Sequence, residues 1–134
     1  MTEAAEQDAL LRADVEAASS AMLQKQLFVV FTEPVNGMGP VMENLEDHLA
    51  FQMSLENEGI LWSAGPLWTD DETRWAGEGM VVIRAENLKH ATEIAKRDPM
   101  HQRGARRFRI RPWMINEGRL TVKLDMSSQT FSLV

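Results

Sequence analysis

Residues 48–67 read HLAFQMSLENEGILWSAGPL, and this stretch contains a helix together with the strand that follows it. The helical pattern begins earlier and covers residues 41–58, with Gly59 placed as its C-terminal stop. Residues 60–65 are the predicted strand, which leads into a Gly-Pro turn. The stretch therefore predicts a chain that mixes helices with strands, and the segments around it complete the pattern.

The rest of the chain extends this pattern in both directions. The element order is β-α-β-β-α-β, with an extra helix in front and a tail behind, which is the ferredoxin-like arrangement of an antiparallel α+β sheet. Both helices of such a fold cover one face of the sheet, so the other face needs a cover as well. We expect a homodimer in which two sheet faces pack together. The further predicted segments are a helix over 3–24, strands over 26–32, 79–85, 107–115 and 120–124, a helix over 88–97, and loops over 34–40 and 67–77.

The domain organisation follows from these segments. We expect an N-terminal helical extension over residues 1–25, an α+β domain over 26–117 and a C-terminal tail over 118–134. The acidic start, MTEAAEQDALL, is unlike a secretory signal. The chain has no cysteine, which excludes disulfides and thiolate catalysis and is typical of a cytoplasmic protein.

The charge of the chain favours one class of partner. A formal net charge of −6 disfavours nucleic-acid binding, which depends on neutralising phosphates. No apolar run approaches the roughly 20 residues of a membrane-spanning helix, so we expect no membrane partner. Residues 96–111 nevertheless form a local basic patch around the single acid Asp98. Such a patch on an acidic protein suits a small anionic molecule better than a long polyanion.

His48 is the first candidate for chemistry. At about 100° per residue, His48, Gln52 and Glu56 all fall within the apolar sector of their helix. Three polar groups in register there predict a hydrated pocket. Two interpretations of His48 stay open, namely a half-exposed imidazole at the border of the core and a titratable group for proton transfer.

Asp98 is the second candidate, and it also has two interpretations. Directly before Pro99, an aspartate can accept backbone N–H groups and start a short helical turn. Alternatively, its carboxylate orients His48 and stabilises the imidazolium. His101 is a second acid–base or ligand-contacting group, or else an exposed turn residue. Asp98 and His101 have no third ligand beside them, so we expect neither a metal site nor a cofactor.

The last strand and the turn after residue 63 complete the candidate site. Strand 107–115 alternates, with apolar residues on one face and a cationic, aromatic set on the other. That set is either a solvated edge or a wall that binds carboxylates through guanidinium groups. Glycine in the turn lets the backbone approach a ligand. The candidate ligand-binding residues are Arg107, Arg109, Arg111, Trp113, Ser63, Gly65 and Pro66.

These segments together resemble the YciI-like (YCII-related) family of dimeric α+β barrels over residues 26–117. The motifs that carry the resemblance are His48, the Ala-Gly-Pro turn at 64–66, the Ala-Glu-Asn segment at 85–87 and Asp98-Pro99, in that order. The resemblance implies a ferredoxin-like fold, a homodimer and a His–Asp pair in the pocket. The well-understood chemistry of the family is cofactor-free elimination of chloride from a chlorinated hydroxyhydroquinone. The arginine-rich last strand and Met100, where the family usually has an aromatic residue, depart from the pattern.

Three functional hypotheses follow. The first is a cofactor-free lyase or isomerase that acts on a small, ring-derived, carboxylated metabolite of the kind found in aromatic catabolism. In it His48 is the general base or acid, Asp98 orients it, and one of the last-strand arginines anchors the carboxylate. The second is a non-catalytic module that binds a small ligand or a partner. The third is a cofactor-free oxygenase acting on a phenol.

Overall fold

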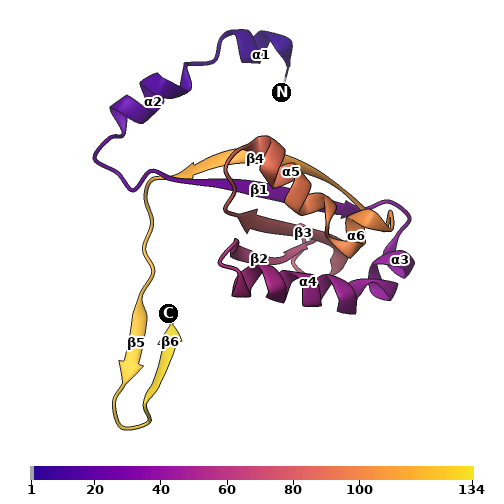
Figure 1. Cartoon of the computed structure of the whole chain (residues 1–134). Helices are drawn as coiled ribbons and strands as arrows, with labels where there is room; N and C mark the ends of the chain where they lie inside the picture. Colours follow the sequence, from indigo (N-terminus) through magenta and orange to yellow (C-terminus); the bar gives the residue numbers. More distant parts are fainter. Residues whose placement is uncertain (1) are drawn as a thin grey trace. The chain divides into compact units, whose positions relative to one another are not determined.

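The computed structural model describes residues 2–134 and divides into two compact units. Gln26–Met114 form the larger unit, and Ile115–Val134 together with the residues before Gln26 form the smaller one. Figure 1 shows the elements of each unit along the chain. Among the described helices, none is both long and apolar enough to cross a membrane.

The larger unit is built on a sheet whose strands have the order β2-β3-β1-β4. The strand β3 runs antiparallel to both of its neighbours, pairing Val81 with Val30 of β1 and with Ala64 of β2. This sheet and its helices confirm the predicted ferredoxin-like α+β fold. The strands are β1 (Lys25–Pro34), β2 (Leu61–Trp68), β3 (Trp75–Ile83) and β4 (Arg106–Ile115).

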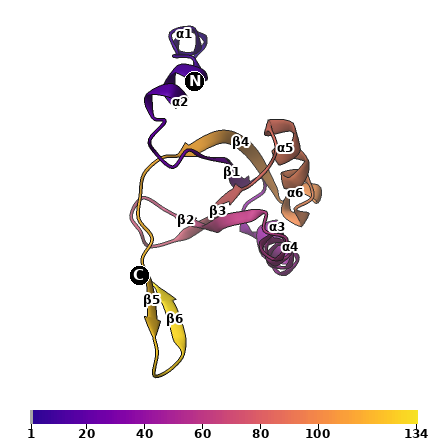
Figure 2. The same ribbon diagram turned by 60° about the vertical axis from the view of Figure 1, so that its left-hand side comes forward.

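The helices α3 (Met38–Glu43), α4 (Leu45–Asn57), α5 (Leu88–Lys96) and α6 (Pro99–Gln102) lie on one side of this sheet (Figures 1 and 2). The prediction of a loop over 34–40 followed by one helix from 41 is wrong, because α3 precedes α4. Gly37 has a φ of 70° and turns the chain into α3. Pro40 fits the first turn of a helix, where its missing N–H is not needed.

The core explains which way each strand residue points. Phe28 and Val30 of β1 pack with Ile94 of α5 in a buried cluster, against which Phe108 and Ile110 of β4 also pack. Side chains alternate between the two faces of a strand. The sheet face away from the helices therefore carries the arginines that alternate with these two residues, namely Arg107, Arg109 and Arg111.

The hairpin between β2 and β3 is tighter than predicted. Strand pairing continues to Trp68↔Trp75, so the connection predicted over residues 67–77 is shorter. Asp71 organises this turn, accepting hydrogen bonds from Thr69 Oγ1 at 2.7 Å and from the Thr73 hydroxyl at 2.7 Å and N–H at 3.1 Å. The bonds from Thr69 and Thr73 lower the pKa of Asp71.

The smaller unit contains α1 (Glu3–Gln7), α2 (Arg12–Ala18) and a hairpin of β5 (Val122–Asp125) and β6 (Thr130–Leu133). The single helix predicted over 3–24 is wrong. Neither α1 nor α2 buries a residue among those described, so no packing offsets the cost of a longer helix.

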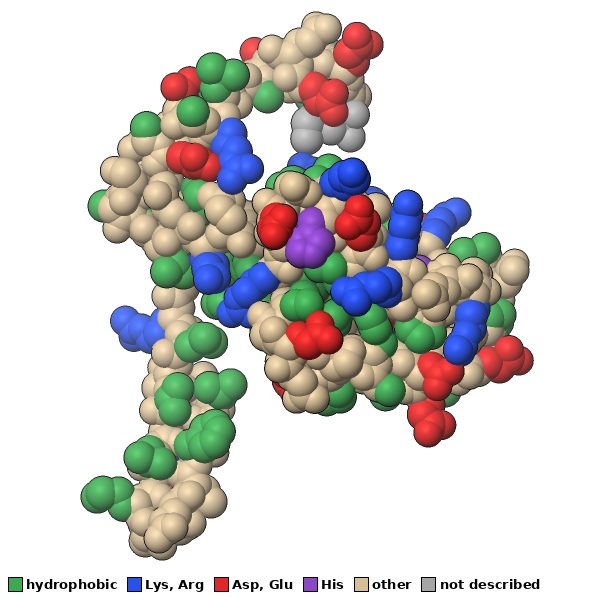
Figure 3. All heavy atoms as spheres, in the orientation of Figure 1, with side chains coloured by type: hydrophobic (Ala, Val, Ile, Leu, Met, Phe, Trp, Pro, Cys, Tyr) green, Lys and Arg blue, Asp and Glu red, His purple; other side chains and the backbone are tan. Residues whose placement is uncertain are grey.

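Apolar residues lie opposite each other on the two strands of this hairpin, in the pairs Val122↔Leu133 and Leu124↔Phe131 (Figure 3). These four residues are 63–74% exposed.

Gly77, near the start of β3, has a conformation that other residues resist. Its φ is +84°, and a Cβ there would lie 2.5 Å from Pro34 Cγ and 2.8 Å from Met38 Sδ. We expect Gly77→Ala to lower the free energy of unfolding by about 2–5 kcal/mol through backbone strain and overpacking. Gly59→Ala is the control, because Gly59 has a φ of +75° but open space around it, and it should lose only about 1–2 kcal/mol. Urea denaturation measures both, and equal losses would contradict the packing argument.

Candidate active site

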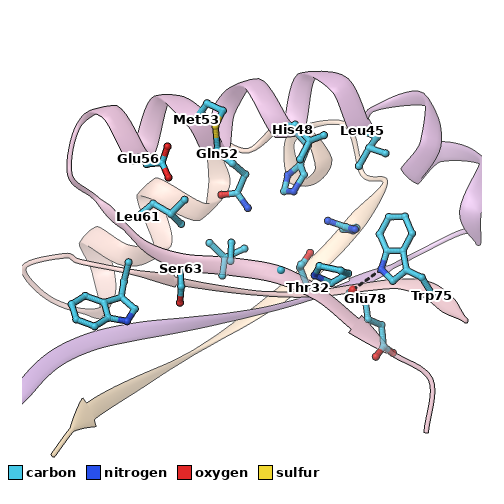
Figure 4. Close-up of a pocket in the computed structure, with 18 of the residues that line it drawn as sticks. Thr32, Leu45, His48, Gln52, Met53, Glu56, Leu61, Ser63, Trp75 and Glu78 are labelled. Carbon is cyan, nitrogen blue, oxygen red and sulfur yellow. Dashed lines mark hydrogen bonds between the residues drawn. The ribbon is translucent and has the colours of Figure 1, made fainter. Parts of the chain in front are cut away.

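A cavity of about 600 Å³ lies between α4 and the sheet. Figure 4 shows His48 and Gln52 projecting from α4 toward the strands below. The helix places them together because His48, Gln52 and Leu55 are spaced by four and three residues and share its buried face. Strands from the whole sheet complete the wall, which includes Thr32, Ser63, Gly65, Pro66, Trp75, Gly79 and Arg106.

His48 and Asp98 form the central pair of this site. The Nδ1 atom of His48 lies 2.7 Å from Oδ2 of Asp98, and the residues are only 7% and 4% exposed. A carboxylate only accepts hydrogen bonds, so Nδ1–H of His48 is the donor. In the neutral ring the Nε2 atom then carries no proton, and it makes no hydrogen bond to residues 2–134. An imidazole in this state presents a lone pair that can accept a proton.

Asp98 also caps α6, so the two interpretations of this residue do not exclude each other. Its Oδ1 atom accepts the N–H of Met100 at 2.9 Å, and Pro99 occupies the first turn of α6. The other carboxylate oxygen bonds His48. The cap fixes the carboxylate, and the fixed carboxylate in turn sets the direction of the imidazole ring.

His101 lies near this pair but is not part of the cavity wall. Its Nδ1 donates to the carbonyl oxygen of Ala95 at 2.7 Å, so its Nε2 accepts the Thr32 hydroxyl at 2.8 Å. The ring of Phe108 packs against it with centroids 4.4 Å apart. Both ring nitrogens are therefore engaged within the chain. His101 contacts the cavity wall only from behind, through the Thr32 hydroxyl, and is not itself exposed to the cavity.

Burial lowers the pKa of His101 below the ordinary value of 6.5, more than the bond to Ala95 and the charge of Asp98 raise it. The unfolded state then binds more protons below pH 6.5, so stability falls as the pH drops through the folded-state pKa. His101→Asn keeps a donor for Ala95 but cannot titrate. In the wild type, His101 should make the free energy of unfolding fall by up to about 1.4 kcal/mol for each pH unit on the acid side. We expect His101→Asn to lack this contribution, so its free energy of unfolding should depend less steeply on pH. Thermal and urea denaturation at several pH values measure the slope, and equal slopes would contradict the burial effect.

Arg106 is a cavity residue that the sequence analysis missed. It is 4% exposed, and its Cζ lies 5.8 Å from the centroid of the Trp75 ring. That ring is held by a hydrogen bond of 2.8 Å from Trp75 Nε1 to the carbonyl oxygen of Glu78 (Figure 4). Burial lowers the pKa of Arg106, and the charge of Asp98 partly offsets this. The predicted strand starts at residue 107, whereas β4 starts at Arg106, and strand alternation places Arg106 on the same face as Phe108.

The four last-strand residues expected to bind ligand lie elsewhere. Arg107 is exposed and pairs with Glu33 at 2.7 Å, and the Arg109 guanidinium stacks 4.6 Å from the centroid of the Phe31 ring. Arg111 and Trp113 are exposed as well. None of the four belongs to the cavity wall beside His48. The reason is strand alternation, which puts the odd-numbered residues of β4 on the opposite face of the sheet.

The turn residues are brought to the site as expected, because Ser63, Gly65 and Pro66 all line the cavity.

Within the described part of the chain, no three histidine or carboxylate side chains gather in a way that would hold a metal ion.

Comparison with known proteins places the chain in a family. The YCII-related domain matches residues 3–114. The solved structure of the 5-chloro-2-hydroxyhydroquinone dehydrochlorinase TftG from Burkholderia phenoliruptrix AC1100 is similar, with a TM-score of 0.50 and 16% sequence identity over 65% of this chain and 92% of that chain. A comparison with curated proteins finds no match. The chain belongs to the YCII-related family.

Proposed function

We propose that the protein is a cofactor-free lyase or isomerase that transfers a proton on a small ring compound. His48 is the proton-transferring group, and Asp98 is its positioning partner. One observation carries this proposal, namely the 2.7 Å hydrogen bond between two buried side chains, one of which forms part of a cavity wall. A buried acid–base pair beside a cavity is the arrangement that general acid–base catalysis uses.

The geometry supports a definite sequence of proton movements. The Nε2 atom of His48 takes a proton from a ring hydroxyl or an acidic ring C–H, and the released electron pair enters the π system of the ring. Asp98 stabilises the resulting imidazolium through Nδ1–H. In a lyase, a leaving anion then departs with its bonding pair from a saturated ring carbon next to the conjugated system, and the released pair forms a new double bond to that carbon. In an isomerase, His48 returns the proton to a different ring atom.

The cavity itself fits a ring-shaped ligand. Its volume of about 600 Å³ falls in the range of small-molecule sites, which is about 300–1,000 Å³. Trp62, Trp68 and Trp75 contribute aromatic surface to its wall, and Gln52 and Ser63 contribute polar groups. Flat aromatic faces with a few polar side chains suit a hydroxylated or carboxylated ring.

The structural neighbour supports the choice of substrate class. TftG is described as a dehydrochlorinase of 5-chloro-2-hydroxyhydroquinone, in complex with 2,5-dihydroxybenzoquinone. An identity of 16% extends the likeness to the fold alone. We propose a hydroxylated or chlorinated ring compound of aromatic catabolism as the substrate class, because the aromatic cavity wall suits such a ring and a protein of the same fold is described as acting on one.

A panel assay tests this proposal. Candidate substrates are chlorinated hydroxyhydroquinones, hydroxybenzoates and unsaturated ring lactones, each incubated anaerobically with the full chain and no added cofactor. Absorbance and chloride release report turnover, which we expect for at least one class. Turnover that requires and consumes oxygen would instead support an oxygenase, and ligand binding without any turnover would support a non-catalytic module.

The homodimer expected from the sequence stays a proposal. Leu27, Val29 and Val82 alternate with core residues and so lie on the sheet face away from the helices, and all three are already buried within the single chain. A second copy would therefore contact mainly the exposed side chains of this face, such as Arg109. Sedimentation equilibrium should give twice the chain mass, and a monomer would contradict the dimer.

A further inference from the structure

Arg106 is a buried cation for which the chain supplies no hydrogen-bonded partner. Its Nε atom is sealed from solvent and donates no hydrogen bond. Its Nη atoms also make no hydrogen bond to residues 2–134, although they are not sealed from solvent. The charge of Asp98 favours the charged guanidinium, but the two Asp98 oxygens bond His48 and Met100 instead. A buried charge is normally paired, because leaving it unpaired away from water is costly.

Other arginines of the same unit show the ordinary behaviour. Arg103 and Arg107 are exposed, and each pairs with a carboxylate at 2.7 Å, namely Asp47 and Glu33. A surface guanidinium can be solvated by water and gains little from its pair. The buried guanidinium of Arg106 is the one that needs a counter-ion, and it belongs to a cavity wall.

The cavity is also electrically asymmetric along α4. Figure 4 shows Trp75 and Glu56 toward opposite ends of the site, with His48 between them. Arg106 lies at the Trp75 end, with its Cζ 5.8 Å from the indole centroid. Glu78 also borders the cavity near Trp75, but its carboxylate is directed away from α4 (Figure 4). A ligand with one negative end would therefore be attracted to Arg106 and repelled by Glu56, which fixes its direction in the cavity.

We propose that Arg106 is the anion receptor of this cavity and that it binds the carboxylate of a ring-shaped acid. A planar guanidinium donates two parallel hydrogen bonds to the two oxygens of a carboxylate. With the carboxylate at Arg106, the ring of the ligand extends along α4 past Nε2 of His48. This inference rests on the proposed function only in treating the bound acid as the substrate, because the binding itself requires no reaction.

A pair of matched probes tests the receptor. Isothermal titration calorimetry compares 2,5-dihydroxybenzoate with 2,5-dihydroxybenzamide, which has the same ring and no charge. We expect the full chain to bind the carboxylate about 10- to 100-fold more tightly than the amide. Arg106→Gln should abolish this preference while changing the amide affinity by less than about threefold. Equal affinities in the wild type, or no binding of the carboxylate, would overturn the proposal.

Two further variants keep the test decisive. Arg107→Gln removes a neighbouring arginine from the opposite sheet face, and this variant should keep the full preference for the carboxylate. If Arg107→Gln lost that preference, the assignment to Arg106 would be overturned. If Arg106→Gln fails to fold, Arg106→Lys decides. An ammonium cannot donate two parallel bonds, so the preference should fall at least about threefold, and an unchanged preference would overturn the proposal.

A final variant separates this inference from the proposed function. His48→Gln should lose turnover but retain the preference for the carboxylate, because His48 is not part of the receptor. A carboxylate preference that depends on Arg106 in a protein without turnover would uphold the receptor and reject the enzyme. Turnover by a wild-type protein that shows no preference for the carboxylate would uphold the enzyme and reject the receptor.

Discussion

Replacing His48 with glutamine should lower kcat for the substrate found in the panel assay by about 100- to 10,000-fold, the usual contribution of a general acid–base group. Glutamine fills a similar volume and can still hydrogen-bond Asp98, but it cannot take up a proton at neutral pH. Steady-state kinetics measures the loss. Circular dichroism and the unfolding temperature should show that the fold is retained.

His90→Gln is the matched control for this substitution. His90 lies on α5 outside the cavity wall, and its Nδ1 accepts the N–H of Glu86 at 3.1 Å. The kcat of this variant should stay within about twofold of the wild type, as expected for a substitution away from the chemistry. Wild-type turnover by His48→Gln would contradict the proposed role of His48.

Asp98→Asn should produce a loss of similar size, about 100- to 10,000-fold in kcat. The asparagine oxygen can still accept the Met100 N–H and cap α6, so the backbone has no reason to move. Its amide nitrogen, however, then faces Nδ1 of His48 and donates to it. This reverses the tautomer of His48 and puts the proton on Nε2, where the substrate proton should go.

The control for Asp98→Asn is an aspartate on the surface. Asp47 is exposed and pairs with Arg103 at 2.7 Å, so Asp47→Asn removes a carboxylate without touching His48. We expect unchanged kcat for Asp47→Asn. A kcat for Asp98→Asn that matches this control would show that the carboxylate of Asp98 acts only as a helix cap.

The central part of the fold could be predicted from the sequence because its signals are local and periodic. The 3.6-residue period put His48 and Gln52 on the inner face of their helix, and both are buried in the structure. Asp98-Pro99 is a local signal for a helix start, and α6 does start there. The contact between His48 and Asp98 spans 50 residues of sequence, so the residues alone left it open.

The errors arise where one residue of register or one long-range contact decides the outcome. A shift of one residue along a strand exchanges its two faces, and starting the last strand at Arg107 instead of Arg106 hid the buried arginine. The pattern over 3–24 is helical throughout, yet α1 and α2 are separate because nothing among the described residues packs a continuous helix. The start of α3 depends on the positive φ of Gly37, which the loop-like composition concealed.

The tautomer of His48 tests the central claim most directly, because it requires no substrate. A long-range ¹H–¹⁵N correlation spectrum of the histidine rings reports which nitrogen carries the proton, and the His48→Gln spectrum assigns the signal. We expect His48 in the wild type to carry its proton on Nδ1 and to leave Nε2 bare, and we expect Asp98→Asn to reverse this. A proton on Nε2 in the wild type, or a signal that Asp98→Asn leaves unchanged, would contradict the account.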